Sequence, residues 1–315
     1  MQAGVCKYHR SEQVCYLYSF ELLQGYRCVH SFDRQRRLEL FRNEQYRQVM
    51  AYEQSVTKVF WTIEEQTRSD TTKVLMNHNI STYRDCIKHL SRLKADRIAL
   101  AYVNGSYKSM REKLLGNGTM TPLEYNCQDK LHADAVNKAC CHLRFKFSIA
   151  YWRTCSFVLG AILEEAFATD VQLIGPSKGD LFALTEKAVG EFIRKPLTIE
   201  PLFVSLEFAL DVFASNVCKQ EMVHEMKHQN ENGQLGVVIY QMSDFVDITY
   251  GPLIPCTAHI GKFAITKVEN EKSDYRFIGV SIPRELRCSS YSWDIICNAS
   301  TVTHGGEERL LHAST

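Results

Sequence analysis

The chain has 315 residues, of which 45% are hydrophobic and 23% are charged. This composition is typical of globular proteins and excludes a mainly disordered, collagen-like or low-complexity chain. The 37 Lys and Arg residues almost balance the 36 Asp and Glu residues, so any RNA-binding surface has to be local. The most apolar stretches, 157–163 and 203–214, are interrupted by polar residues and are shorter than the roughly 18 apolar residues of a membrane span. We therefore expect a soluble chain without a membrane-spanning segment.

The N-terminal region is rich in arginine and poor in acidic residues. In residues 1–40 this bias fits a mitochondrial transit peptide, and it fits a disordered or mis-annotated terminus equally well. A helix is predicted for residues 41–55. Its expected apolar stripe consists of Leu38, Phe41, Val49 and Tyr52. The arginines here are candidate contacts to RNA phosphates, unless they form a solvated helix face or belong to a transit peptide. They are Arg34, Arg36, Arg37, Arg42 and Arg47.

Residues 56–130 have the pattern of a small mixed α/β unit. Apolar and polar residues alternate over Lys58–Glu64, which predicts a strand, and 74–76 follows as a second short strand. The apolar run 98–103 predicts a buried strand. It ends at Asn104–Gly105, a pair that favours a two-residue hairpin turn with positive φ. Two strands, a helix and then a hairpin are typical of a β-grasp fold.

The helix of this small unit is predicted from its N-terminal signal. Thr82 and Asp85 have the spacing of a capping box, in which each residue bonds the backbone of the other. Its expected apolar face consists of Cys86, Ile87, Leu90 and Leu93.

Residues 131–285 predict a second unit. A long helix is expected over 151–167, with Glu164 and Glu165 facing solvent at its end. Its buried stripe consists of Trp152, Cys155, Leu159, Ile162 and Ala166. A later strand breaks at Gly251-Pro252, and two further strands are predicted at His259–Val268 and Tyr275–Ile282. Residues 286–315 are expected to form a C-terminal tail.

Several strings in these units resemble threonyl-tRNA synthetases. VLMNHNISTYRDCIKHL and ALAYVNGSYKSM resemble their ubiquitin-like TGS domain. YWRTCSFVLGAILEEAF, VDITYGPLIPCTAHIGKFAITKVEN and YRFIGVSIP resemble, in the same order, their editing domain. The resemblance implies an α+β protein, with a β-grasp TGS domain at 56–130 followed by an α+β editing-like domain at 131–285.

The resemblance also identifies the positions of an editing pocket, which in the family holds three histidines and a cysteine. Here those positions are Arg153, Phe157, Thr249 and Leu253. Arginine stays protonated and cannot serve as a base or a metal ligand, and the Phe and Leu side chains have no polar atom. We therefore expect a vestigial pocket without catalytic residues, metal, cofactor or small-molecule substrate. We expect no aminoacylation either, because 315 residues leave no room for a synthetase catalytic core.

A TGS-like unit followed by a degenerate editing-like unit resembles a family of synthetase-derived proteins of the mitochondrial large ribosomal subunit. The most specific strings are MNHNIST, VNKA, YWRTC, DFVDITYGPLIP and RFIGVSIP. This resemblance implies a structural protein of the mitochondrial matrix whose partners are ribosomal RNA and neighbouring large-subunit proteins. The alternatives are a freestanding tRNA-editing deacylase and a tRNA-binding module. The segment 140–150 interrupts the family pattern, and we hypothesise that it is a retained intron or a mis-joined exon.

Other motifs give weaker signals. His224-Glu225-Met226-Lys227-His228 matches the zinc motif H-E-x-x-H, but its charged Lys227 and the polar turn after it favour a solvated helix face. The loop at 175–179, GPSKG, lacks the full phosphate-binding pattern. The 12 cysteines include no C-x-x-C pair, so we expect reduced thiols rather than a zinc ribbon or a redox motif.

Overall fold

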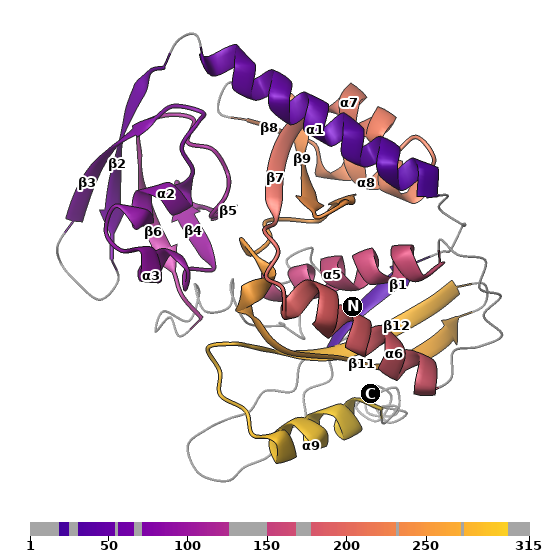
Figure 1. The fold of residues 1–315 in the computed structure, drawn as a ribbon. Helices are drawn as coiled ribbons and strands as arrows, with labels where there is room; N and C mark the ends of the chain where they lie inside the picture. Colours follow the sequence, from indigo (N-terminus) through magenta and orange to yellow (C-terminus); the bar gives the residue numbers. More distant parts are fainter. Residues whose placement is uncertain are drawn as a thin grey trace, which may run out of the picture.

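The computed structural model describes residues 19–24, 31–53, 56–65, 71–125, 150–167, 178–230, 233–271 and 274–301. Figure 1 shows a small unit at the left, a larger unit at the right, and one long helix that runs along the larger unit toward the small one. Of the hypothesised insertion, only Ala150 is among the described residues. Most of the GPSKG loop also lies outside them.

The small unit is a five-stranded sheet in the order β3-β2-β6-β4-β5. β2 and β6 pair in parallel at its centre, and the other neighbours are antiparallel. Two short helices share the core with one face of this sheet. The elements are β2 (Lys58–Glu64), β3 (Thr71–Asn77), α2 (Tyr83–Lys88), α3 (Arg92–Ala95), β4 (Leu100–Val103), β5 (Ser106–Ser109) and β6 (Gly118–Leu123).

Local sequence signals predict this unit well. Strand β2 has the predicted bounds, and its alternate residues Val59, Trp61 and Ile63 are buried. Thr82 and Asp85 form both bonds of the capping box. Asn104 and Gly105 have φ of 48° and 81°, so the hairpin turn with positive φ is confirmed.

The predicted apolar face of the helix is wrong at one position. Cys86 and Ile87 are fully buried, whereas Leu93 is 76% exposed. The helix does not continue through this segment, because α2 ends at Lys88 and α3 begins anew with Ser91 as its N-cap. The new start turns Leu93 away from the face that α2 buries.

The larger unit contains two sheets. One has three strands in the order β1-β12-β11, and the other has the order β10-β9-β7, with β8 paired to β9. The strands are β1 (Ser19–Gln24), β7 (Glu200–Ser205), β8 (His228–Gln229), β9 (Leu235–Met242), β10 (Phe245–Ile248), β11 (Ile260–Glu271) and β12 (Asp274–Pro283). The two predicted C-terminal strands are confirmed as the β11–β12 hairpin.

Helices cover both sheets (Figure 1). They are α1 (Ser31–Glu53), α5 (Ala150–Phe167), α6 (Lys178–Ala188, continued by a π-helical turn over Val189–Ile193), α7 (Leu206–Val212), α8 (Val217–Met226) and α9 (Ser290–Thr301). A short 3-10 helix covers Thr257–His259. Helices α1, α7 and α8 share a core with the second sheet. None of the helices in the described part of the chain has the length and apolar character needed to cross a membrane.

The terminal segments are more structured than expected. Strand β1 pairs with β12, and α1 begins at Ser31, ten residues before the predicted helix. The predicted stripe of α1 holds at Phe41, which is fully buried, but not at Val49, which is 39% exposed. In the predicted C-terminal tail, α9 packs against the β11–β12 hairpin, and the Lys262 ammonium lies 5.6 Å from the Trp293 ring centre.

Candidate functional site

The four positions predicted for an editing pocket lie where the first turns of α5 meet the loop that follows β10. The Ile254 backbone amide donates to Thr154 Oγ1 at 3.1 Å, and this hydroxyl donates to the Ala150 carbonyl at 2.7 Å. Thr154 is fully buried, so the bond to Ile254 is shielded from water. The loop is thereby fixed against the helix that carries Arg153 and Phe157.

Arg153 covers one end of this site. Its Nη1 donates to the Tyr250 carbonyl oxygen at 3.0 Å. The guanidinium lies in the space that a side chain at position 251 would need, since a Cβ on Gly251 would lie 1.9 Å from Nη1. Burial lowers the pKa of Arg153 to about 10. The group is still a cation at neutral pH, so it cannot accept a proton or bind a metal ion.

Phe157 and Leu253 fill the other end with apolar volume. Phe157 is 3% exposed and Leu253 is fully buried. The Phe157 ring meets the rings of Phe245 and Tyr240 edge to face, with centroid distances of 5.0 and 6.4 Å. Tyr240 is 2% exposed, and burial raises the pKa of its hydroxyl. Three aromatic rings and a leucine therefore occupy the space where polar ligands are expected in an editing pocket.

Thr249 is the one uncharged polar side chain at the four positions. Its hydroxyl donates to the Gly251 carbonyl oxygen at 2.8 Å, and the Gly251 amide donates back to the Thr249 carbonyl at 2.8 Å. The hydroxyl thus closes a local turn. Neither a base nor an activated nucleophile stands beside it at these positions.

Buried titratable groups nearby are held in their neutral forms. Burial raises the pKa of the Cys155 thiol to about 12, so it does not ionise at neutral pH. The Tyr151 hydroxyl lies 2.6 Å from Ser281 Oγ, which in turn donates to the Lys262 carbonyl at 2.7 Å. His259 is 5% exposed, and burial lowers its pKa to about 4. Tyr151 and Ser281 thus form a neutral polar network within the core, while His259 packs against the Tyr125 ring at 5.5 Å.

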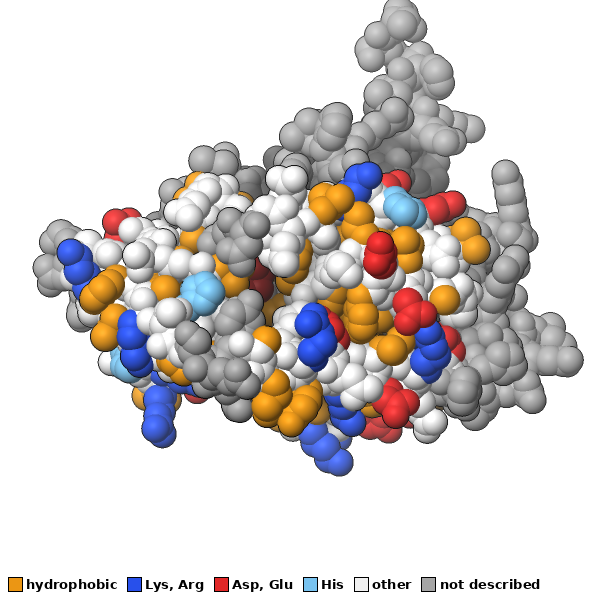
Figure 2. Space-filling view, turned by 90° about the horizontal axis from the view of Figure 1, so that it is seen from above, with side chains coloured by type: hydrophobic (Ala, Val, Ile, Leu, Met, Phe, Trp, Pro, Cys, Tyr) orange, Lys and Arg blue, Asp and Glu red, His pale blue; other side chains and the backbone are white. Residues whose placement is uncertain are grey.

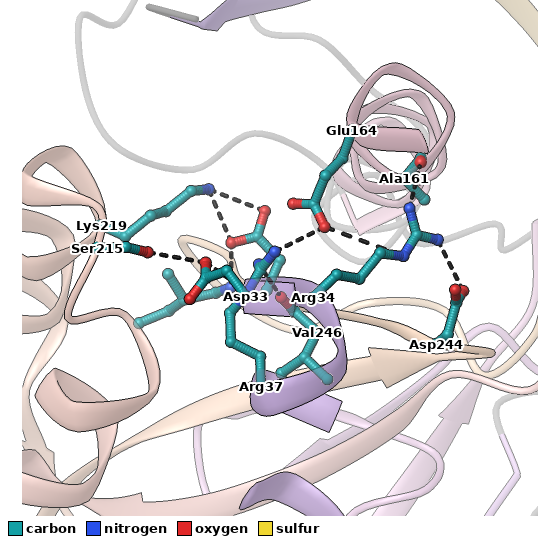
Figure 3. Close-up of polar contacts among 11 residues, drawn as sticks. Asp33, Arg34, Arg37, Ala161, Glu164, Ser215, Lys219, Asp244 and Val246 are labelled. Atoms are coloured by element: carbon teal, nitrogen blue, oxygen red, sulfur yellow. Dashed lines mark hydrogen bonds and ion pairs between the residues drawn. The ribbon is translucent and has the colours of Figure 1, made fainter. Parts of the chain in front are cut away.

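Two of the predicted RNA contacts lie inside the protein, which makes that prediction wrong for them (Figure 3). Arg34 and Arg37 are 7% and 5% exposed. Arg34 Nη2 donates to Asp244 at 2.7 Å, and Arg37 Nη2 donates to Glu164 at 2.6 Å. The acidic partners neutralise both guanidinium groups, so the arginines cannot reach phosphates without breaking the core.

The same ion pairs explain why α1 begins early. Arg37 Nη1 also donates to the Val246 carbonyl at 2.9 Å, which ties the first turns of α1 to β10. Glu164 was expected to face solvent, but its side chain is only 11% exposed and holds Arg37. Burial raises the pKa of Glu164, while the neighbouring arginines oppose that shift. A second pair, Lys219 to Asp247 at 2.8 Å, lies beside it.

The other three arginines lie closer to solvent. Arg36 is bonded to both the carboxylate and the backbone carbonyl of Asp211. Arg47 is exposed and pairs with Glu44 of its own helix at 2.7 Å. Arg42 is exposed on the same helix. Phosphate contacts by these three arginines stay a prediction.

The H-E-x-x-H motif does not form one helix face. Helix α8 ends at Met226, and His228 belongs to strand β8. The His228 ring packs edge to face on Phe203 at 5.6 Å, while His224 is exposed on the helix. The two imidazoles are therefore on different elements. Among the described residues, no three His, Cys, Asp or Glu side chains are grouped as a metal site would need.

Part of the chain is similar to threonine–tRNA ligases. The threonine–tRNA ligase of Sulfurovum sp. (strain NBC37-1) is 24% identical over 183 residues, 56% of this chain and 29% of the ligase. The probable cytoplasmic threonine–tRNA ligase 1 of Dictyostelium discoideum is 25% identical over 238 residues, 68% of this chain and 30% of the ligase. The chain thus matches less than a third of the length of these enzymes. No family model matches it.

The chain is also similar to a ribosomal protein over most of its length. The large ribosomal subunit protein mL39 of Drosophila melanogaster is 29% identical over an alignment of 255 residues, which covers 71% of this chain and 71% of that protein. The match confirms the resemblance that the sequence strings predicted. Unlike the ligase matches, it covers more than two thirds of the relative.

Proposed function

We propose that this protein is a non-catalytic structural component of the mitochondrial large ribosomal subunit and supports mitochondrial translation. The observation that carries this proposal is the similarity to the Drosophila ribosomal protein over 71% of both chains. On this proposal, the partners are ribosomal RNA and neighbouring large-subunit proteins, and the protein acts in the mitochondrial matrix. Arg36, Arg42 and Arg47 are its candidate RNA contacts on α1.

The proposal includes a division of the chain at about residue 130. Residues 56–130 are a TGS-like β-grasp domain and residues 131–285 are a degenerate editing-like domain. The sheet order of the small unit supports this assignment, because its first and last strands, β2 and β6, pair in parallel at the centre. The position of α5 against the loop after β10 supports the second domain.

The proposal also holds that the editing pocket is vestigial. In its support, Phe157 and Leu253 are buried among aromatic rings, Arg153 is a cation bonded to a backbone carbonyl, and Thr249 closes a turn. A hydrolase needs a group that can take a proton or hold a water at the reacting ester. As they are packed, none of the four side chains at these positions can take a proton or hold that water.

The experiment compares hydrolysis with ribosome assembly. The purified full-length chain is incubated with Ser-tRNA(Thr), and in parallel the protein is depleted from cells and the large subunits are quantified. We expect hydrolysis at the rate of buffer alone and a loss of assembled large subunits. Hydrolysis that Arg153→Ala abolishes would instead establish a deacylase, and unchanged large subunits after depletion would refute the ribosomal role.

A further inference from the structure

The segment that forms α2 and α3 carries an unusual excess of positive charge. Between Arg84 and Arg97 the chain has five Lys or Arg residues and two Asp residues, whereas the whole chain has 37 against 36. The cations are Arg84, Lys88, Arg92, Lys94 and Arg97, and His89 lies among them. This segment is therefore a local basic region in a chain that is otherwise close to neutral.

Three of the five cations are already paired. Arg84 is bonded to Asp96, Lys88 Nζ lies 2.7 Å from Asp85, and Lys94 Nζ lies 2.7 Å from Glu65. These pairs use both aspartates of the segment. Among the residues that the structure describes, neither Arg92 nor Arg97 has a side-chain partner, and both are exposed. The guanidinium groups of Arg92 and Arg97 are thus exposed to solvent. The other three cations each already have one carboxylate partner.

The fold fixes which way this surface faces. Ile87 and Ala95 are fully buried and hold α2 and α3 on the sheet of the small unit, so the opposite side of the two helices is the outer surface. Lys and Arg side chains lie at the lower left of Figure 2, over the small unit, and others lie at the lower centre of the view. The outer side of α2 and α3 thus carries the exposed side chains of Arg92 and Arg97.

We propose that this surface binds the phosphate backbone of RNA, with Arg92 and Arg97 as the principal contacts. A guanidinium matches two phosphate oxygens at once, and each contact gains affinity by releasing counterions from the nucleic acid. A protein partner is less suited, because an interface needs an apolar centre and Leu93 is the one exposed apolar side chain between Arg84 and Arg97. The proposal rests on the proposed ribosomal function, which supplies the RNA.

The first test measures the salt dependence of binding. The full chain, Arg92→Gln/Arg97→Gln and the control Arg194→Gln/Lys195→Gln are titrated with a short RNA duplex at several salt concentrations. The control removes two exposed cations from the larger unit, and in the described part of the chain their side chains have no ion-pair partner. We expect the slope of log affinity against log salt to fall by about 2 in the first variant, about 1 for each lost phosphate contact.

The control variant is expected to keep the slope of the unsubstituted chain. An equal loss in the control, or no loss in Arg92→Gln/Arg97→Gln, would overturn the proposal. Polyglutamate serves as an acidic protein surrogate. If it competes with the RNA at equal charge concentration, the surface is a general anion binder and the proposal of an RNA site is wrong. Equal unfolding midpoints of the three proteins exclude misfolding as a cause.

The second test uses ribosomes. Mitochondrial large subunits are irradiated with ultraviolet light, and RNA-linked peptides of this chain are mapped by mass spectrometry. We expect linked peptides from residues 84–97. If the chain is present in the subunits but its linked peptides come from other segments only, the RNA surface is elsewhere while the ribosomal role stands. If the chain is missing from the subunits, the proposed function itself fails.

Discussion

Two pairs of arginines in this protein differ in burial and in ion pairing. Arg34 and Arg37 lie in the first turns of α1, which packs against the larger unit, and each has a carboxylate within 2.7 Å. Arg92 and Arg97 lie on the outer surface of the small unit and have no partner there among the described residues. The two pairs therefore differ in whether a carboxylate of the protein neutralises the guanidinium charge. Buried arginines that are paired with carboxylates hold the fold together, whereas exposed arginines without partners are available to an external anion.

The comparison also explains why the two pairs are hard to distinguish from the sequence. Arg34 and Arg37 stand in an arginine-rich segment that has the appearance of a basic tail. Their partners, Asp244 and Glu164, lie 210 and 127 residues further along the chain. The density of charge along the sequence does not show that these distant carboxylates pair with the two arginines. Only the tertiary fold shows which cations have a partner.

The largest expected effect comes from removing a buried cation. Arg37→Ala leaves Glu164 inside the protein without its main partner and deprives the Val246 carbonyl of a donor. We expect a loss of about 3–5 kcal/mol in the free energy of unfolding, measured by urea denaturation. Arg42→Ala, at an exposed position of the same helix, is the matched control and should cost less than about 0.5 kcal/mol. Similar losses in both variants would remove the distinction between buried and exposed arginines.

A smaller effect is expected from a buried base that the fold keeps neutral. Burial lowers the pKa of His259 to about 4, from an ordinary value of 6.5. Between these values the unfolded chain binds a proton that the folded chain does not, so stability falls as the pH falls from 6.5 toward 4. The maximum slope is about 1.4 kcal/mol per pH unit for one group.

Urea denaturation at several pH values from neutral to acidic measures this slope. His259→Gln should flatten the curve relative to the unsubstituted protein, while His224→Gln, which changes an exposed histidine, should leave it unaltered. An unchanged slope in His259→Gln would show that His259 titrates as freely in the folded state as in the unfolded one.

The smallest expected effect concerns the helix face that sequence analysis assigned wrongly. Leu93 is 76% exposed, so Leu93→Ala should change the free energy of unfolding by less than about 0.5 kcal/mol. Ile87 is fully buried, and Ile87→Ala should cost about 2–5 kcal/mol. Thermal or urea unfolding of the two variants compares them directly. Equal costs would mean that Leu93 is packed against something in the native protein.

Predictions that depend on neighbours in the chain succeed here. The capping box of Thr82 and Asp85 and the turn at Asn104–Gly105 are fixed by residues within a few positions of each other. Strand β2 is similarly predicted by its own alternation. These elements of the small unit can therefore be predicted without knowledge of contacts to distant parts of the chain.

Predictions that depend on distant contacts succeed only in part. The sequence strings predict four pocket positions on two segments, but the hydrogen bond between Ile254 and Thr154 that joins these segments links residues 100 positions apart. Solvent exposure of Glu164 is predicted wrongly, because its arginine partner comes from a segment interpreted as an extension. The basic segment from Arg84 to Arg97 is visible in the sequence, although only the structure separates its paired cations from its free ones.

The central claim of this account is that the chain is a structural part of the mitochondrial large ribosomal subunit. Gradient sedimentation of mitochondrial lysates at moderate salt, followed by quantitative mass spectrometry of every fraction, tests it most directly. We predict that the chain follows the large-subunit proteins through the gradient in constant proportion. A chain found only in the free-protein fractions, while the large-subunit proteins sediment normally, would contradict the claim.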